Sequence, residues 1–161
     1  DSMPARPVWV DETEEDMEER WHAFLAVAMT KHLDRVVCLT SMAEARKKSP
    51  KYAGDLDAGT FPYPWLNFAI EDYGAPAEAD WEAFARFVRD VAQCIKAGEN
   101  VLLHCAGGVG RTGTTAICLM HHFGLDHDEA LSLILASRSE PETREQEELI
   151  EWHANQVTPD S

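Results

Sequence analysis

One short stretch of the chain brings a sulfur nucleophile and a fixed cation close together. Cys105 follows a brief apolar run, and Arg111 comes six residues later. The residues between them are rich in glycine: Ala106, Gly107, Gly108, Val109 and Gly110. Glycine lets successive backbone N–H groups turn inward without Cβ clashes, and a helix that starts near Arg111 would add its positive end. The spacing therefore predicts a loop that binds a dianion such as phosphate.

The side chains around this loop suggest a reaction as well as binding. A cysteine in such an electropositive field favours its thiolate, which would face the phosphorus of the bound phosphate. Arg111 adds a planar fork that can grip two phosphate oxygens and strengthen its hold in the transition state. Thr112 stands where its hydroxyl can reach the Cys105 sulfur. The alternative, an incidental tight turn around a buried cysteine, is disfavoured by this combination of residue types.

The pattern His104-Cys105-x5-Arg111-Thr112-Gly113 resembles the signature loop of the protein tyrosine phosphatase superfamily. The resemblance spans about residues 35–150, although only this loop, residues 104–113, is strongly specific. It implies that Cys105 is the nucleophile, that Arg111 binds the phosphate, and that His104 is a buried imidazole bonded to the loop. A relative that only binds phosphoproteins is the alternative, but such relatives usually lack the cysteine or the arginine.

A phosphate monoester also needs a proton on its leaving oxygen, which a thiolate cannot supply. The segment 71–76, Glu-Asp-Tyr-Gly-Ala-Pro, looks like the general-acid loop of this family. Asp72 is the predicted acid, and Glu71 is the second choice. Tyrosine-specific members place Trp-Pro before the aspartate, whereas Ile70 and Glu71 stand here. A plain aspartate turn before Gly74 is the alternative.

Two weaker resemblances concern residues farther along the chain in each direction. Residues 142–146 resemble the segment in which related enzymes place a glutamine that orients the attacking water, which makes Gln146 the candidate. An exposed helical glutamine is the equally weighted alternative. Glu44 resembles a glutamate that supports the arginine in tyrosine-specific members, but a solvated charged turn is the favoured interpretation of its surroundings.

Alternating strands and helices must position these residues. Candidate strands lie at residues 8–10, 35–40, 65–70 and 100–104. Candidate helices lie at 13–33, 81–95, 111–123, 126–137 and 142–155, and residues 44–60 are expected to be mostly loop. The pattern predicts an α/β fold, protein tyrosine phosphatase-like, with a central, mostly parallel sheet of four to five strands flanked by helices. Residues 1–161 are interpreted as a single phosphatase domain, with Cys105 at the carboxyl end of a strand, where ligands bind in such sheets.

The net charge of the chain narrows the range of expected substrates. The 14 basic and 29 acidic residues give a net charge of −15, which repels nucleic acid and anionic membranes. Phosphoinositide phosphatases of the superfamily carry lysines between the cysteine and the arginine, and this loop has none. The expected partner is a phosphorylated protein or peptide, with phosphotyrosine preferred and phosphoserine or phosphothreonine as further substrates. A phosphoinositide or an RNA 5′-phosphate is the alternative.

The sequence pattern of the remaining cysteines and histidines suggests no further chemistry. Cys38, Cys94 and Cys118 lie in apolar runs, and no CxxC pair occurs, so these residues are expected to be buried thiols. The protein is expected to be cytoplasmic and monomeric, without a membrane-spanning segment. Cys118 with His121, His122 and His127 superficially resembles a zinc cluster, but the spacing matches no standard site. No metal and no cofactor are therefore expected, because phosphoryl transfer through cysteine needs neither.

Overall fold

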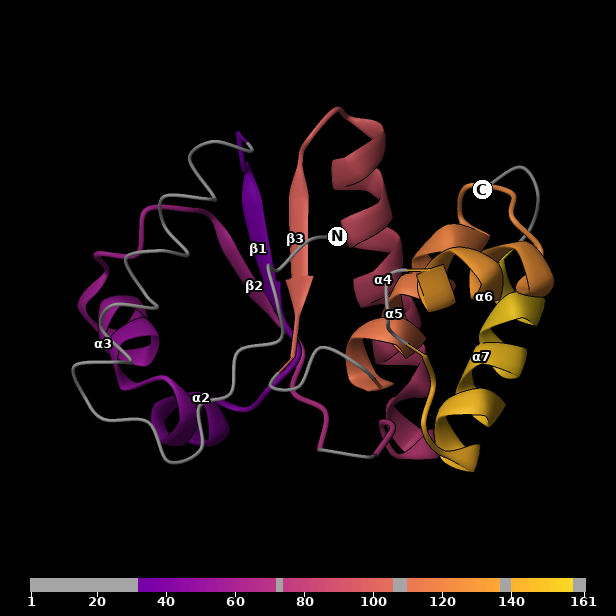
Figure 1. Ribbon diagram of the computed structural model, residues 1–161, viewed down its shortest axis with the longest axis horizontal. Helices are drawn as coiled ribbons and strands as arrows, with labels where there is room; N and C mark the ends of the chain where they lie inside the picture. The colour runs from indigo at the N-terminus through magenta and orange to yellow at the C-terminus, as the bar shows by residue number, and fades with distance from the viewer. Residues whose placement is uncertain (1–31, 72–73, 106–109, 137–139, 158–161) are drawn as a thin grey trace.

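The computed structural model describes residues 32–71, 74–105, 110–136 and 140–157. Its sheet has the order β2-β1-β3, with β1 (Arg35–Cys38), β2 (Trp65–Asn67) and β3 (Val101–His104) all parallel (Figure 1). The predicted α/β fold with a parallel sheet is confirmed. The expected four to five strands are too many for the described residues, which contain three; the candidate strand at residues 8–10 lies outside them.

The three strands are short, and their carboxyl ends lie at one edge of the sheet, next to the candidate site. The register aligns Cys38 with both Asn67 and His104, so the three strands end together. The Asn67 side-chain amide donates to the carbonyls of Cys38 and Thr40 at 2.9 and 2.8 Å. The Cys38 carbonyl also accepts from the Phe68 N–H at 3.0 Å, so backbone pairing continues for a short distance past the strand ends. The central strand β1 is fully buried along its apolar run, as expected of a strand covered on both faces.

One face of the sheet carries α2 (Met42–Lys48) and α3 (Pro50–Ala58) (Figure 1). The prediction of a loop over residues 44–60 is wrong. The Ser41 hydroxyl caps α2 by accepting from the Glu44 N–H at 3.1 Å, and Pro50 stands in the first turn of α3, where its missing N–H costs nothing. Tyr52 is buried against Cys38, so a few apolar contacts hold helices whose sequences are mostly polar.

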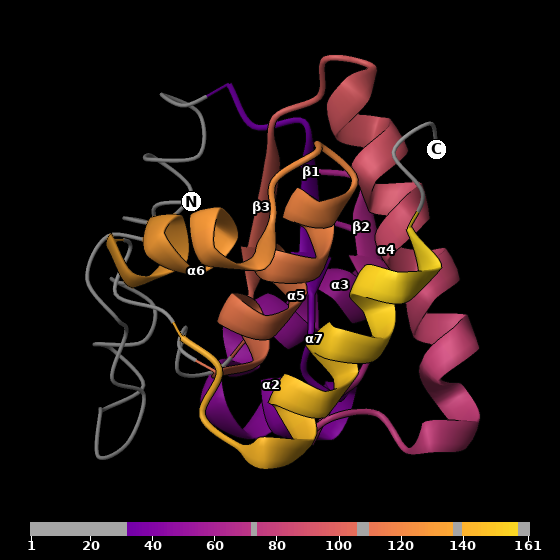
Figure 2. The same ribbon diagram turned by 90° about the vertical axis from the view of Figure 1, so that its right-hand side faces the viewer.

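The other face is covered by four helices (Figures 1 and 2): α4 (Trp81–Lys96), α5 (Gly110–His121), α6 (His127–Ala136) and α7 (Arg144–Gln156). These helices confirm the predicted ones to within a few residues at each end. A single turn of 3₁₀-helix, η1 (Glu78–Asp80), precedes α4, and Asp126 and Glu129 bond each other's backbone N–H groups at the start of α6, as predicted. The predicted helix at 13–33 lies outside the described residues.

The main core lies between the sheet and these four helices. Its fully buried members come from each of these layers and include Val37, Phe84, Ile117 and Leu149. In the part of the chain that the structure describes, no helix has the length and apolar character needed to cross a bilayer. The core fixes the start of α5 against the end of β3, and this junction holds the predicted nucleophile.

Candidate active site

Cys105 lies directly after β3, at the carboxyl edge of the sheet, where the sequence places it. Only 6% of the residue is exposed, and its sulfur accepts a hydrogen bond from the Thr112 hydroxyl at 3.0 Å. Thr112 stands in the first turn of α5, which begins at Gly110. The predicted loop residues Ala106, Gly107, Gly108 and Val109 lie outside the described residues.

Arg111 is held in place by two other segments of the chain. Its Nη1 and Nη2 donate to the two carboxylate oxygens of Glu44 at 2.9 and 3.0 Å, and Nη1 also donates to the Ile70 carbonyl at 2.8 Å. The Arg111 side chain is 1% exposed. A two-pronged ion pair of this kind fixes both the position and the plane of a guanidinium. The cation predicted to hold phosphate is therefore oriented by the fold itself.

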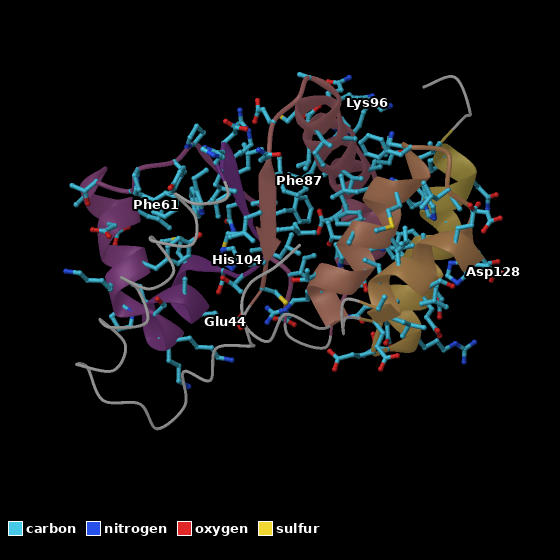
Figure 3. All side chains as sticks on the ribbon, turned by 45° about the horizontal axis from the view of Figure 1, so that its top comes forward. Glu44, Phe61, Phe87, Lys96, His104 and Asp128 are labelled. Carbon is cyan, nitrogen blue, oxygen red and sulfur yellow. The ribbon has the colours of Figure 1, made fainter. Side chains whose placement is uncertain are left out.

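Glu44 is the main functional residue that the sequence interpretation undervalued. A solvated turn was favoured there, yet the Glu44 side chain is 19% exposed and faces the site from α2, near the strand end that carries His104 (Figure 3). The hydrogen bond from Arg111 lowers the pKa of Glu44, against a smaller opposing effect of burial. Lys48, one turn farther along α2, adds a longer contact of 3.8 Å. Glu44 therefore supplies the counter-charge that makes a buried Arg111 tolerable.

His104, the last residue of β3, belongs to a second network, on the face of the sheet opposite to that of Cys105. Its Nε2 lies 3.0 Å from the Tyr52 hydroxyl, which accepts from the Trp65 indole N–H at 2.7 Å. An indole can only donate, so Tyr52 is the acceptor of the bond from Trp65, and its side chain also bonds that of Cys38. The expected bond from His104 to the loop involves residues outside the described ones. The contacts that the structure describes instead tie the residue before the nucleophile to α3 and β2.

Cys38 joins this network from β1. Burial raises the pKa of Cys38, but the hydrogen bond and charge of His104 and the bonds with Thr40 outweigh it and lower the pKa to about 7. The Cys38 sulfur lies 3.2 Å from the Thr40 hydroxyl. Cys38 was expected to be a buried core thiol, and it is fully buried. Because β1 and β3 run in register, Cys38 shares the face of His104, and Cys105, the next residue, takes the other face.

The general-acid candidates lie on the segment between β2 and η1. Asp72 is outside the described residues, so its predicted role remains untested. Glu71, the second choice, is exposed, and its carbonyl accepts from the Gly74 N–H at 2.9 Å, which closes a turn. The adjacent Ile70 carbonyl is the one that Arg111 bonds. The segment that bears the two acid candidates is thus bonded, at Ile70, to Arg111.

Gln146 approaches the same segment from α7. Its amide nitrogen donates to the Gly74 carbonyl at 3.0 Å, while its amide oxygen accepts from the Glu142 N–H at 2.7 Å. Gln146 is 1% exposed, so it is not the exposed helical glutamine of the alternative interpretation. The predicted role in orienting water is not tested by these contacts. They show that Gln146 joins α7 to the segment that bears Asp72.

Comparison with known proteins identifies the family to which this arrangement belongs. Residues 12–157 match the family model PTP-SAK, described as a Swiss Army Knife protein, DSP-PTPase phosphatase domain. The chain belongs to this family. The match spans Cys105, Arg111, residues 71–76 and α7, and it confirms the resemblance that the signature loop indicated.

Individual relatives agree with this assignment. The putative tyrosine phosphatase 067L of Invertebrate iridescent virus 3 is 33% identical over 57 residues, which cover 35% of this chain and 24% of the viral protein. The chain thus aligns with about a quarter of the length of that relative. The crystal structure of Tk-PTP in the active form is 25% identical with a TM-score of 0.60, covering 90% of this chain and 88% of that one. Kinase associated phosphatase, solved with its catalytic cysteine replaced by serine, has a TM-score of 0.68 at 16% identity, covering 96% and 84%.

Proposed function

We propose that this phosphatase domain hydrolyses phosphotyrosine in proteins, with phosphoserine and phosphothreonine as further substrates, through a phosphocysteine on Cys105. The observation that carries the proposal is the pairing of two contacts at the start of α5. Thr112 donates to the Cys105 sulfur, and the neighbouring Arg111 is fixed by Glu44 and Ile70. The proposed nucleophile and the proposed phosphate-binding cation are thereby both held at the start of α5, the sulfur by Thr112 and the guanidinium by Glu44 and Ile70.

In the first half-reaction, the Cys105 thiolate attacks the phosphorus of the bound ester. The sulfur–phosphorus bond forms as the phosphorus–oxygen ester bond breaks, and Asp72 gives its proton to the departing oxygen. Arg111 and the amides of residues 106–110 hold the three equatorial oxygens, on which charge increases in the transition state. Glu44 does not contact the substrate; it keeps the Arg111 guanidinium in the orientation that meets those oxygens.

In the second half-reaction, water attacks the phosphocysteine. Asp72, now a carboxylate, accepts a proton from that water, and the sulfur–phosphorus bond breaks to release phosphate. Sulfur must leave as a thiolate, which the Thr112 hydroxyl stabilises from 3.0 Å. Gln146 is retained as the candidate that orients the water, and its bond to Gly74 gives it a second role in holding the acid segment. No step requires a metal or a cofactor.

The choice of a phosphoprotein rests on charge and on the composition of the loop. A chain with a net charge of −15 disfavours polyanionic lipids and RNA at long range. The loop also lacks the lysines that would offset a phosphoinositide headgroup. A phosphopeptide presents one phosphate on a chain whose other charges can be positive, which makes it the best match to this surface.

The proposal is tested by turnover and binding in parallel. Wild type and Cys105→Ser are assayed with p-nitrophenyl phosphate from acidic to neutral pH, and phosphopeptide binding is measured for both. We expect turnover that disappears in Cys105→Ser while binding persists, and unchanged turnover in the control Cys94→Ser on α4. Binding without any wild-type turnover would instead identify a phosphoprotein-binding module. A panel of phosphopeptides, phosphoinositides and RNA 5′-phosphates then identifies the preferred substrate class.

The role of Asp72 is tested separately with substrates that differ in their leaving group. Asp72→Asn should lose roughly 10²- to 10⁴-fold in kcat for esters with a poor leaving group, the range over which general acids act. The loss should shrink for p-nitrophenyl phosphate, whose leaving oxygen hardly needs a proton. Equal losses for both kinds of ester would remove Asp72 from this role, and Glu71→Gln would then be examined in the same way.

A further inference from the structure

A second cluster of reactive side chains lies at the far end of α5 from Arg111. Cys118 and His121 stand three residues apart on one face of α5, and His153 meets them from α7, the neighbouring helix (Figure 2). Their potential ligand atoms, one from each residue, all lie within 4.8 Å of one another. Seven residues of helix, about 10 Å, separate Cys118 from Arg111, so the cluster is distinct from the phosphate site.

We propose that Cys118, His121 and His153 bind one Zn²⁺ ion that braces α5 against α7. The donor set is one thiolate and two imidazoles, which zinc uses in proteins. Softer thiolate and imidazole ligands also disfavour Mg²⁺ and Ca²⁺, which prefer oxygen.

The geometry of the two imidazole rings fits a shared ion. His121 Nδ1 and His153 Nδ1 lie 3.0 Å apart. Two nitrogens bound to one tetrahedral zinc at about 2.0 Å each would stand about 3.3 Å apart, so only a small adjustment is needed. The ring centroids are 5.2 Å apart and the rings are stacked, with 22° between their planes. Rotating a ring by 180° exchanges the nitrogen that faces inward, so each histidine can present either one.

The cluster is buried and short of hydrogen-bond partners. His153 is 1% exposed, and the Nε2 atoms of His121, His122 and His153 have no hydrogen-bond partner among the described residues. Buried polar atoms are normally paired, so such a concentration calls for a ligand. The His122 ring lies 5.5 Å from that of His153, but His122 is not among the three residues whose ligand atoms converge.

Zinc binds cysteine as a thiolate and histidine as a neutral imidazole. On binding, the Cys118 proton leaves to solvent as the zinc–sulfur bond forms.

The local sequence pattern suggests a different set of candidate ligands, because it groups residues that are neighbours along the chain. The expectation of no metal weighed Cys118 and His121 with His122 and His127. His127 is exposed at the start of α6, whereas His153, 32 residues after His121, completes the cluster across two helices. Only the packing of α7 on α5 brings these side chains together.

The test uses the full chain, stripped of metal and carrying Cys105→Ser so that the catalytic thiol cannot contribute. Calorimetric titration with Zn²⁺ should give one ion per chain. Cys118→Ala and His153→Phe should each weaken binding by more than the ~10- to 100-fold typical of an outer-shell partner. The matched controls Cys94→Ala and His127→Ala should leave the affinity unchanged. Binding that survives both Cys118→Ala and His153→Phe, or no binding by the parent, would overturn the site.

A spectroscopic measurement keeps the test independent of how the variants fold. Co²⁺ bound to the parent chain should show a thiolate charge-transfer band and the intense visible bands of a tetrahedral ion. A Co²⁺ spectrum without the charge-transfer band would exclude Cys118 as a ligand and overturn the proposal. Zinc at about 100 times its Kd should also raise Tm by roughly 5–10 °C, because it binds only the folded chain.

Discussion

At the scale of single residues, the ion pair between Arg111 and Glu44 fixes the guanidinium at the proposed phosphate site. Arg111 is almost completely buried, so its charge needs a partner whether or not phosphate is bound. Glu44 provides that partner with both carboxylate oxygens. The pair therefore serves stability and catalysis together, and a change at Glu44 should affect both.

Replacing Glu44 with glutamine should weaken this arrangement without removing every contact. We expect Glu44→Gln to lower kcat/KM by roughly 10- to 100-fold, since a hydrogen bond between charged groups contributes about 1.5–3 kcal/mol. The matched control is Asp57→Asn, which breaks the exposed Arg46–Asp57 pair between α2 and α3. That change should cost less than about 1 kcal/mol and leave activity unaltered. Similar kinetic losses in both variants would show that Glu44 acts only through the stability of these helices.

The same pair predicts a dependence of stability on pH. Arg111 lowers the folded-state pKa of Glu44 below its ordinary value of 4.5, so the unfolded chain binds more protons across that interval. The contribution of Glu44 is therefore complete above pH 4.5 and is lost as the pH falls through the lower, folded-state value. Thermal unfolding should show the largest difference in Tm between wild type and Glu44→Gln near neutral pH. A difference that grew on acidification would have the wrong sign.

Some residues of the candidate site could be predicted from the sequence, and others could not. Cys105, Arg111 and Thr112 lie within eight residues, and their spacing fixes their geometry once a strand and a helix flank the loop. Glu44 is 67 residues from Arg111, and its short polar helix resembles a surface turn. Tyr52 and His104 likewise meet only because α3 packs on the sheet. Contacts of this kind depend on tertiary packing, which no local pattern encodes.

At the scale of secondary-structure elements, α7 controls the segment that bears Asp72 through Gln146. Gln146→Leu removes the bond to Gly74 while keeping the buried volume. If Gln146 mainly holds this segment, the loss of kcat, roughly tenfold, should grow as the leaving group becomes poorer. Steady-state rates for a series of aryl phosphates measure this, with Gln93→Leu on the exposed face of α4 as the control. A burst of product followed by equally slow turnover of every ester would favour the water-orienting role instead.

The start of α5 has a steric requirement that explains the glycine of the Arg-Thr-Gly motif. A Cβ on Gly113 would lie 2.9 Å from the backbone nitrogen of Glu140 and 3.1 Å from its carbonyl carbon, so the chain before α7 would have to shift. We expect Gly113→Ala to lower the free energy of unfolding by about 1–3 kcal/mol. Gly54→Ala in α3, where a Cβ would meet nothing within 4 Å, should raise it by about 0.5–1 kcal/mol. Urea denaturation measures both, and equal effects of the two substitutions would contradict this explanation.

The helices also show which elements can be predicted from the periodic spacing of apolar residues and which cannot. α4 keeps a long apolar stripe and was predicted almost to the residue. α2 and α3 bury only a few small or aromatic residues against Cys38, too few to produce a stripe, and they were expected to be mostly loop. The three predicted strands that fall within the described residues were placed correctly but are shorter than expected. Beyond their ends, Asn67 adds side-chain bonds to carbonyls of the neighbouring segment.

At the scale of the whole molecule, the net charge of −15 should act on how substrates approach. Long-range repulsion works over the Debye length, about 30 Å at 0.01 M salt and about 8 Å at 0.15 M. A phosphopeptide with flanking lysines should therefore associate faster than one with flanking glutamates when the salt concentration is low. The phosphate and the reaction are the same for both peptides, so only the encounter differs.

This expectation can be measured with two phosphotyrosine peptides that differ only in those flanking charges. At 0.01 M salt, kcat/KM for the basic peptide should exceed that for the acidic one by roughly tenfold or more, within the range known for electrostatic steering. As salt rises to 0.15 M, the value for the basic peptide should fall and that for the acidic peptide should rise, because screening removes attraction and repulsion alike. If both values instead moved in the same direction, the ions would be acting on the phosphate site itself, and the surface charge would have no part in choosing substrates.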